Sequence, residues 1–322
     1  MPLPGMLLAD VARPRALQAP VGIGICAPSG ALPDPAALQR SAQYLTSLGH
    51  AVRVMPGSLG RDGYCAGTPQ ARVADLHALA QDPAVQLIMA ARGGFGLSHL
   101  LPLLDWPMLA ASSKLFCGFS DFTAFHLALL RSTGQISLAG PMATSDFAGS
   151  APSALHAGQF WGLLALGAEG HHYPAWTHDG PPLAGSWQGT LWGGNLAVLT
   201  HLIGTPWFPD VDGGLLFLED IAEAPYRIER MLMQLELSGV LARQQAVLLG
   251  AFTACEPADG ALIDYRLAAV IAWLRKRFHG PVLTGLPFGH IRDKWTLPVG
   301  AKATLTANGQ EARLNVASFL QR

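Results

Sequence analysis

From Val21 onward, short apolar runs alternate with segments of helical periodicity, and this alternation constrains the fold more than any other feature. Strand, helix, strand, helix in that order predicts a parallel sheet with helices on both faces. Ligands bind beyond the carboxyl ends of such strands, where this chain carries three glycine-containing turns, APSG, RGGFG and GFSD. The predicted strands lie in VGIGICAPSG, AVRVM, VQLIMAARGG, KLFCGFSD and ISLAGP, and the predicted helices span 35–48, 68–79, 98–104 and 122–131.

The chain has 322 residues, more than one hydrophobic core usually supports, so we expect two domains. The second half contains two apolar strand-like runs, GLLFLED and AVLLGAF, predicted helices at 226–238 and 262–278, and short strands after them. The predicted fold class is α/β, with an N-terminal, mostly parallel sheet flanked by helices and a smaller, β-rich mixed α/β C-terminal domain. The boundaries we expect are an extension at 1–20, the first domain at 21–150, a Gly-, Pro-, His- and Trp-containing linker at 151–184, and the second domain at 185–322.

Charged residues make up 13% of the chain, and 21 Lys and Arg oppose 22 Asp and Glu for a net charge of -1. This balance offers no basic surface to nucleic acid or an anionic membrane, so we expect a small ligand and neither of those partners. The four cysteines are scattered and no H-E-x-x-H motif occurs, so we expect no metal and no cofactor. The sequence shows neither a signal-peptide pattern nor a long uncharged apolar stretch, which favours a cytoplasmic protein with free thiols.

Ser120 lies where the apolar run LFCGF meets a segment of helical periodicity. It could be a helix N-cap, since serine commonly satisfies the first free N–H groups of a helix. It could also be a nucleophile at a sharp strand-to-helix turn, where Gly118 leaves room and the helix N-terminus offers N–H groups to an oxyanion. The G-x-S-x-G motif is not met, because Phe122 stands at its second glycine. The local sequence leaves both interpretations open.

The turn Arg92–Gly96, RGGFG, follows another predicted strand. Its glycines allow backbone to approach a ligand closely, so it is either a simple turn or an oxyanion- or substrate-binding loop. It matches neither the dinucleotide-binding nor the phosphate-loop motif, which argues against a nucleotide site.

Acidic and imidazole groups occur at two further places. Glu219 and Asp220 end the run GLLFLED, where acids are usually solvated, although a partly buried one could orient a histidine. His290 sits in a glycine-flanked loop, GLPFGHIRDKW, and loops often carry catalytic groups. Ser120, Glu219 and His290 therefore supply a nucleophile, an acid and a base on two predicted domains, which only folding could bring together at an interface.

Seven segments, in this order, make the chain resemble the LD-carboxypeptidase family of serine peptidases. The resemblance runs from about residue 21 to the C-terminus, and within the family it is greatest to cytoplasmic muramoyltetrapeptide carboxypeptidases. The segments are GICAPSG, ARGGFGLSHLLPLLDW, CGFSDFTAFHLALL, GPM, GTLWGGNLAVLTHLIGTPW, LFLEDIAEAPYRIERMLMQLELSGVL and GLPFGHIRDKWTLPVGAKATL.

The resemblance implies Ser120 as nucleophile, Glu219 as the acid and His290 as the base, without a metal. It implies an oxyanion hole made by backbone N–H groups of Asp121 and of the glycine turn, at Gly94 beside Gly93. The expected reaction releases the terminal D-alanine of the murein tetrapeptide during cell-wall recycling, by a homodimeric enzyme. The turn departs modestly from the family pattern, because Phe95 stands where tyrosine is frequent.

Two alternatives stay open at this point. A branch of the same family inactivates microcin-type peptidyl nucleotides, and a non-catalytic protein could bind small peptides in the same interdomain cleft. The group that binds the substrate carboxylate is also open among three basic residues, Arg227, Arg292 and Lys294.

Overall fold

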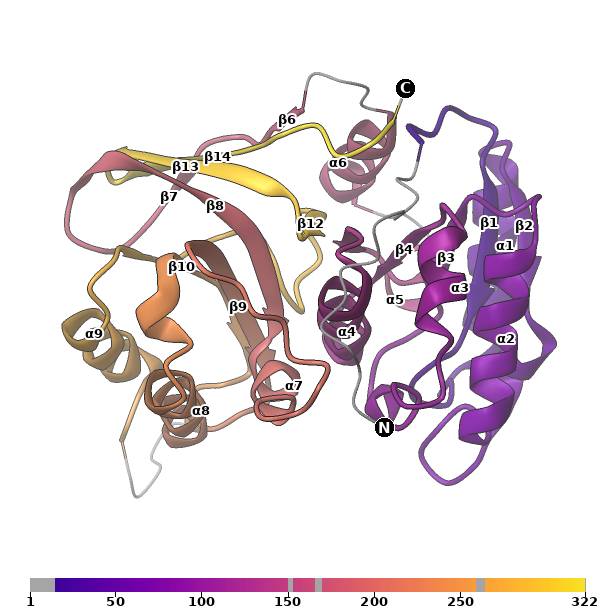
Figure 1. Ribbon diagram of the computed structural model, residues 1–322, viewed down its shortest axis with the longest axis horizontal. Helices are drawn as coiled ribbons and strands as arrows, with labels where there is room; N and C mark the ends of the chain where they lie inside the picture. The colour runs from indigo at the N-terminus through magenta and orange to yellow at the C-terminus, as the bar shows by residue number, and fades with distance from the viewer. Residues whose placement is uncertain (1–14, 150–152, 166–169, 259–263, 322) are drawn as a thin grey trace.

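The computed structural model describes residues 15–149, 153–165, 170–258 and 264–321, which form two α/β units side by side (Figure 1). The first unit is built on a six-stranded sheet of order β12-β5-β4-β3-β1-β2. Strands β1 to β5 are parallel and β12 is antiparallel to β5. The strands are β1 (Gly22–Cys26), β2 (Ala51–Val54), β3 (Leu87–Ala90), β4 (Leu115–Gly118), β5 (Ser137–Ala139) and β12 (Leu297–Val299).

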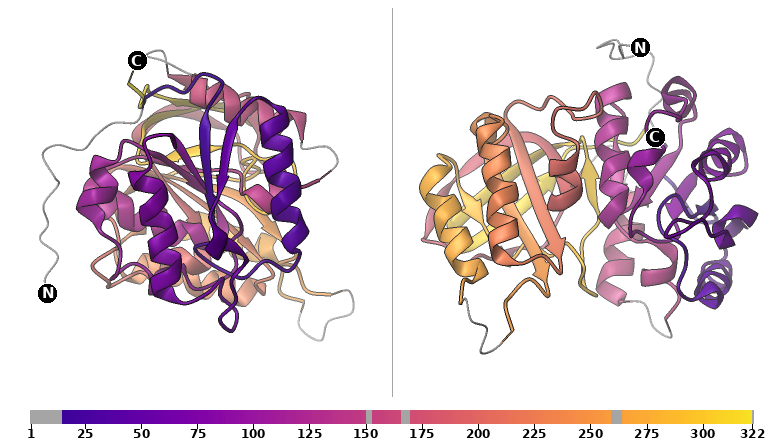
Figure 2. Two further views of the ribbon diagram at one scale, coloured as in Figure 1. Left: turned by 90° about the vertical axis from the view of Figure 1, so that its right-hand side faces the viewer. Right: turned by 90° about the horizontal axis from the view of Figure 1, so that it is seen from below.

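Helices cover both faces of this sheet (Figures 1 and 2). The central strands β1, β3, β4 and β5 are buried along their whole length, which explains why they read as continuous apolar runs. Three helices begin with a cap and a proline, where Asp34, Thr68 and Asp105 accept hydrogen bonds from backbone N–H groups. The helices are α1 (Pro35–Ser47), α2 (Pro69–Gln81), α3 (Trp106–Ala111), α4 (Thr123–Thr133) and α5 (Ala143–Asp146), with 3-10 turns η1 (Pro56–Leu59), η2 (Leu97–His99) and η3 (Ser120–Phe122).

The second unit is built on a mixed eight-stranded sheet of order β11-β10-β9-β8-β13-β14-β6, with β7 paired to β14. Strands β8 to β11 are parallel, and the remaining pairs are antiparallel. The fold class predicted from the sequence is thus confirmed. The elements of the second unit are β6 (His171–His172), β7 (Trp176–Thr177), β8 (Leu183–Asn195), α7 (Leu196–His201), β9 (Gly214–Ile221), α8 (Pro225–Leu237), η4 (Leu241–Arg243), β10 (Gln244–Thr253), α9 (Leu267–Arg277), β11 (Val282–Leu283), β13 (Lys302–Gly309) and β14 (Glu311–Val316). Helix α6 (Ala154–Ala165) packs against His50 and Phe147 of the first unit.

The chain crosses between the two units more often than a simple linker would. The range 151–184 contains α6 and the strands β6 and β7, and these strands pair with β14 of the second sheet. In the other direction, β12 belongs to the C-terminal part of the chain but pairs with β5 of the first sheet. The helix expected at 98–104 is shortened to the 3-10 turn η2, and part of the helix expected at 262–278 lies outside the described residues.

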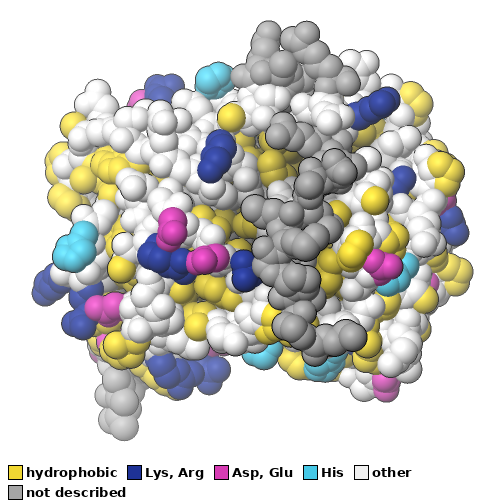
Figure 3. Space-filling view, in the orientation of Figure 1, with side chains coloured by type: hydrophobic (Ala, Val, Ile, Leu, Met, Phe, Trp, Pro, Cys, Tyr) yellow, Lys and Arg dark blue, Asp and Glu magenta, His cyan; other side chains and the backbone are white. Residues whose placement is uncertain are grey.

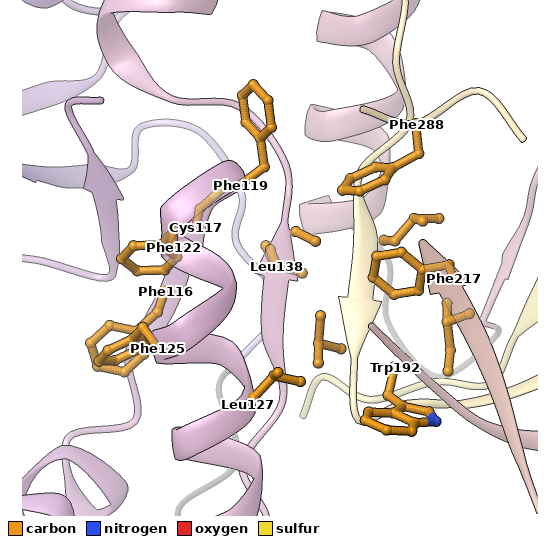
Figure 4. Close-up of a cluster of buried hydrophobic side chains, with 14 of the residues drawn as sticks. Phe116, Cys117, Phe119, Phe122, Phe125, Leu127, Leu138, Trp192, Phe217 and Phe288 are labelled. Atoms are coloured by element: carbon orange, nitrogen blue, oxygen red, sulfur yellow. The ribbon is translucent and has the colours of Figure 1, made fainter. Parts of the chain in front are cut away.

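A single hydrophobic cluster extends through both units. Figure 4 shows Phe116, Phe122 and Phe125 on one side of β5 and β12, with Trp192 and Phe217 on the other. Because β12 lies in the middle of this cluster, the loop that joins β11 to β12 is fixed to both sheets. That loop contains His290.

The surface agrees with the balanced composition. On the face shown in Figure 3, basic and acidic side chains intermingle and are separated by hydrophobic and uncharged ones. Among the described helices, none combines the length and the apolar character that crossing a bilayer requires.

Gly193 provides a test of how β8 and β9 are joined. Its φ is +136°, and an added Cβ would lie 1.9 Å from the carbonyl oxygen of Phe217. We expect Gly193→Ala to lower the free energy of unfolding by about 3 kcal/mol or more, through backbone strain and a backbone clash. Gly204 also has positive φ, but nothing lies within 4 Å of its added Cβ, so Gly204→Ala should cost only about 1–2 kcal/mol. Equal losses in chemical denaturation would contradict this account.

Candidate active site

Ser120 occupies a strained turn between β4 and α4. Its φ is +61°, a left-handed conformation that is unusual for a residue other than glycine and is typical of exposed nucleophiles at such turns. Neither η3 nor α4 has a side-chain hydrogen bond at its N-cap, so the serine does not serve as the helix cap. The structure therefore favours the second interpretation of this stretch, in which the hydroxyl is free for chemistry.

The RGGFG turn lies directly against Ser120. A Cβ added to Gly93 would lie 2.8 Å from the Ser120 Cβ and 2.9 Å from its Oγ, so only glycine allows this approach. Gly94 has a φ of +106°. Within the described part of the chain, its N–H donates no hydrogen bond to another residue. The turn therefore places Gly93 against the Ser120 side chain, and the N–H of the next residue, Gly94, is available as a donor.

Two buried charged side chains hold this turn in place. Asp121 accepts a hydrogen bond from the Leu97 N–H at 3.0 Å, and burial raises the pKa of Asp121. Arg72 donates to the carbonyl oxygens of Gly96 at 2.9 Å and of Pro28 at 2.7 Å. Arg72 was not among the residues predicted from the sequence, although its place on the apolar stripe of a helix, four residues before the buried Leu76, was an available signal.

Glu219 and His290 form a direct hydrogen bond. The His290 Nδ1 lies 2.7 Å from Glu219 Oε2, and the Glu219 side chain is completely buried while that of His290 is 17% exposed. The Thr253 hydroxyl donates to the backbone oxygen of His290 at 3.0 Å. Because the glutamate engages Nδ1, Nε2 is the ring nitrogen left to exchange a proton with a substrate.

Asn195, also not predicted from the sequence, bonds the Glu219 carboxylate on its other side. Its Nδ2 donates to Glu219 Oε1 at 3.2 Å and to Asp220 Oδ1 at 3.0 Å. Its Oδ1 caps α7 by accepting from the Val198 N–H, and its own N–H donates to Thr123 Oγ1 of α4. Through its side chain and its backbone N–H, one residue thus joins Glu219 to the helix that follows Ser120. The signal was a polar residue at the end of a strand, directly before a helix.

Asp220 is buried beside this network. Its carboxylate accepts from the backbone N–H groups of Ala197 and Ile221, both at 2.9 Å, and burial raises the pKa of Asp220 to about 6. Glu219 and Asp220, near the end of β9, are therefore both buried, whereas acids at strand ends are usually solvated.

The two halves of the site meet at Phe119. The Phe119 ring lies 4.9 Å from the His290 ring between centroids, and Phe119 directly precedes Ser120. No hydrogen bond joins Ser120 to His290 among the described residues, and such bonds are often long before substrate binds. Ser120, His290 and Glu219 thus lie at one junction of the two units.

The three basic candidates for carboxylate binding fall into two groups. Arg227 lies on α8 and pairs with Glu223, and its side chain is 48% exposed. Arg292 and Lys294 line a cavity of about 440 Å³ that Phe119 and His290 also line. Among the described residues, no cluster of three His, Cys, Asp or Glu side chains is arranged to hold a metal ion.

Comparison with known proteins places this geometry in a family. Residues 23–140 match the LD-carboxypeptidase N-terminal domain, and residues 188–305 match the LD-carboxypeptidase C-terminal domain. The muramoyltetrapeptide carboxypeptidase of Oxalobacter formigenes is 41% identical with a TM-score of 0.86, over 94% of this chain and 100% of that one.

Two further relatives of this chain are named for different activities. The murein tetrapeptide carboxypeptidase of Pseudomonas aeruginosa is 34% identical over 253 residues, 76% of this chain and 80% of that protein. The microcin C7 self-immunity protein MccF of Escherichia coli is 27% identical over 270 residues, 76% of this chain and 78% of that protein. The family models and these identities together show that the chain belongs to the LD-carboxypeptidase family and is a serine-type carboxypeptidase.

Proposed function

We propose that this enzyme releases the C-terminal D-alanine from murein tetrapeptide in the cytoplasm, as a step of peptidoglycan recycling. The observation that carries the proposal is the buried Glu219–His290 hydrogen bond beside the strained Ser120 turn. The names of the Oxalobacter and Pseudomonas relatives support the substrate. Membership in a peptidase family favours an enzyme over a non-catalytic peptide-binding protein. The homodimer implied by the resemblance belongs to the same proposal.

The reaction begins when the Ser120 hydroxyl attacks the carbonyl carbon of the L,D peptide bond and passes its proton to His290 Nε2. Glu219 fixes the tautomer of the ring and stabilises its cation. The N–H groups of Asp121 and Gly94 stabilise the oxyanion that forms. The C–N bond then breaks, His290 gives the proton to the departing amine of D-alanine, and an acyl-enzyme remains. Water, deprotonated by His290, hydrolyses this ester and frees Ser120.

The MccF relationship supports a second candidate, hydrolysis of microcin-type peptidyl nucleotides. Purified protein incubated separately with murein tetrapeptide, the matching pentapeptide and a peptidyl adenylate analogue distinguishes the two. We expect D-alanine from the tetrapeptide only, insensitivity to chelators, and a loss of at least about 1,000-fold in turnover for Ser120→Ala. Cleavage of the adenylate analogue alone would favour the second candidate, and chelator sensitivity would count against a serine mechanism.

The identity of the acid can be tested with two neighbouring glutamates. Glu219→Gln should reduce kcat by about 100-fold to 10,000-fold, because an amide can neither fix the productive tautomer nor stabilise the imidazolium. Glu223→Gln should change kcat little, since Glu223 pairs with Arg227 on the surface. Steady-state kinetics with the tetrapeptide measure both. A larger loss for Glu223→Gln, or for Asp220→Asn, would show that the acid is assigned wrongly.

The glycine turn gives a further prediction. Gly93→Ala should reduce kcat by about 100-fold or more, because its methyl group would displace Ser120 from the oxyanion donors. Gly162→Ala is the matched control, since its added Cβ meets nothing within 4 Å on α6. Thermal unfolding of both variants should stay near that of the wild type. Unchanged kcat in correctly folded Gly93→Ala would remove the turn from the proposed oxyanion hole.

A further inference from the structure

The cavity beside His290 has one wall that includes the proposed catalytic base and one wall that the proposed mechanism does not use. Phe119 and His290 form the first wall, and Asp146, His156, Arg292 and Lys294 contribute to the second. Asp146 and His156 come from the segment between β5 and the second domain, and the two basic residues come from the loop after His290. The cavity therefore lies at the same junction as the proposed active site.

The second wall is charged, although most of it is enclosed. Lys294 is 3% exposed and forms an ion pair with Asp146, and its Nζ lies 4.6 Å from the centre of the Phe119 ring. The ammonium group also donates to the Ile291 carbonyl oxygen at 3.1 Å. Lys294 is thus committed to holding the loop in place. A buried lysine with these partners is better suited to positioning than to binding an incoming carboxylate.

His156 has hydrogen-bonding capacity that is not used. Its side chain is 5% exposed and its Nδ1 lies 3.5 Å from Asp146 Oδ1. Among the described residues, its Nε2 has no hydrogen-bond partner. A buried polar atom without a partner is costly, and it usually marks a place that another group fills. Arg292 is exposed and adds a permanent positive charge to the lining. The lining therefore combines two cations, one carboxylate and one unsatisfied imidazole nitrogen.

The position of the cavity indicates which part of a substrate would occupy it. In a serine hydrolase the base returns its proton to the leaving group, so the leaving group must lie against the histidine. Glu219 occupies Nδ1, so the proton leaves from Nε2. A cavity that shares His290 as a wall therefore suits the leaving residue, and a leaving amino acid carries a free carboxylate.

We propose that this cavity binds the terminal carboxylate of the leaving residue, with Arg292 and His156 as its partners and the Lys294–Asp146 pair as their support. This inference rests on the proposed function, because it assigns the specificity of the same site. Burial lowers the pKa of His156, and Asp146 beside its other ring nitrogen opposes that shift. A carboxylate placed against Nε2 would oppose it further and favour the protonated form. Arg227, which does not line the cavity, has no part in this recognition.

The test compares murein tetrapeptide with the same peptide ending in D-alaninamide. The wild-type protein should cleave the free acid at least about 10-fold more efficiently in kcat/KM, because charge-assisted hydrogen bonds to the carboxylate are lost in the amide. Arg292→Gln and His156→Gln should each shrink this ratio several-fold by lowering kcat/KM for the acid alone. Calorimetric titration of Ser120→Ala protein with both peptides measures the same preference without turnover.

Matched variants separate the possible outcomes. Arg313→Gln, which changes an exposed arginine on β14, should leave the acid-to-amide ratio at the wild-type value. A wild-type ratio in both Arg292→Gln and His156→Gln, or loss of the ratio in Arg227→Gln alone, would overturn the inference. Arg292 is exposed, so its variant remains informative if His156→Gln melts at a lower temperature. Cleavage of acid and amide with equal efficiency overturns the inference alone. Release of neither D-alanine from the acid nor D-alaninamide from the amide overturns the proposed function.

Discussion

The buried carboxylate of Glu219 is the group on which the arrangement of the site depends. An ionised carboxylate without water is stable only if donors surround it, and here His290 Nδ1 and Asn195 Nδ2 supply the hydrogen bonds. His290, which bonds the buried carboxylate, is therefore also the base in the proposed reaction. Asn195 extends this link to Thr123 at the start of α4, so Glu219, His290 and the helix that follows Ser120 share one network.

Strain at Ser120 persists because its surroundings fix it from several directions. A left-handed serine costs on the order of 1–3 kcal/mol, and such costs persist only where neighbouring contacts over-determine the conformation. Asp121 and Arg72 hold the RGGFG turn against the serine, and β12 ties the histidine loop to the sheet that carries Ser120. The junction between the units is thus part of the site, because neither unit holds a complete set of groups.

Much of the site could be anticipated, because its residues sit at sequence landmarks. Ser120 follows an apolar strand and a glycine, Glu219 ends a strand, and His290 lies in a glycine-flanked loop. Asn195, Arg72 and His156 sit at weaker landmarks, because the fold decides which partners they meet. The bonds that tie Asn195 and Arg72 to the site reach residues 24 to 44 positions away, and His156 faces Asp146 of another helix. Local patterns also gave no sign that β6, β7 and β12 pair across the expected domain boundaries, since short strands carry little periodicity.

The order of apolar runs and helical segments determined the α/β class by itself, because burial on both faces of a parallel sheet leaves a pattern that is local in sequence. Resemblance along the sequence also indicated the peptidase family. Only the tertiary structure decided that Glu219 is enclosed, that it bonds His290, and that Arg292 and Lys294 share a cavity with that histidine while Arg227 does not. Burial and hydrogen bonding between distant segments depend on how the two sheets pack, and no local pattern records that packing.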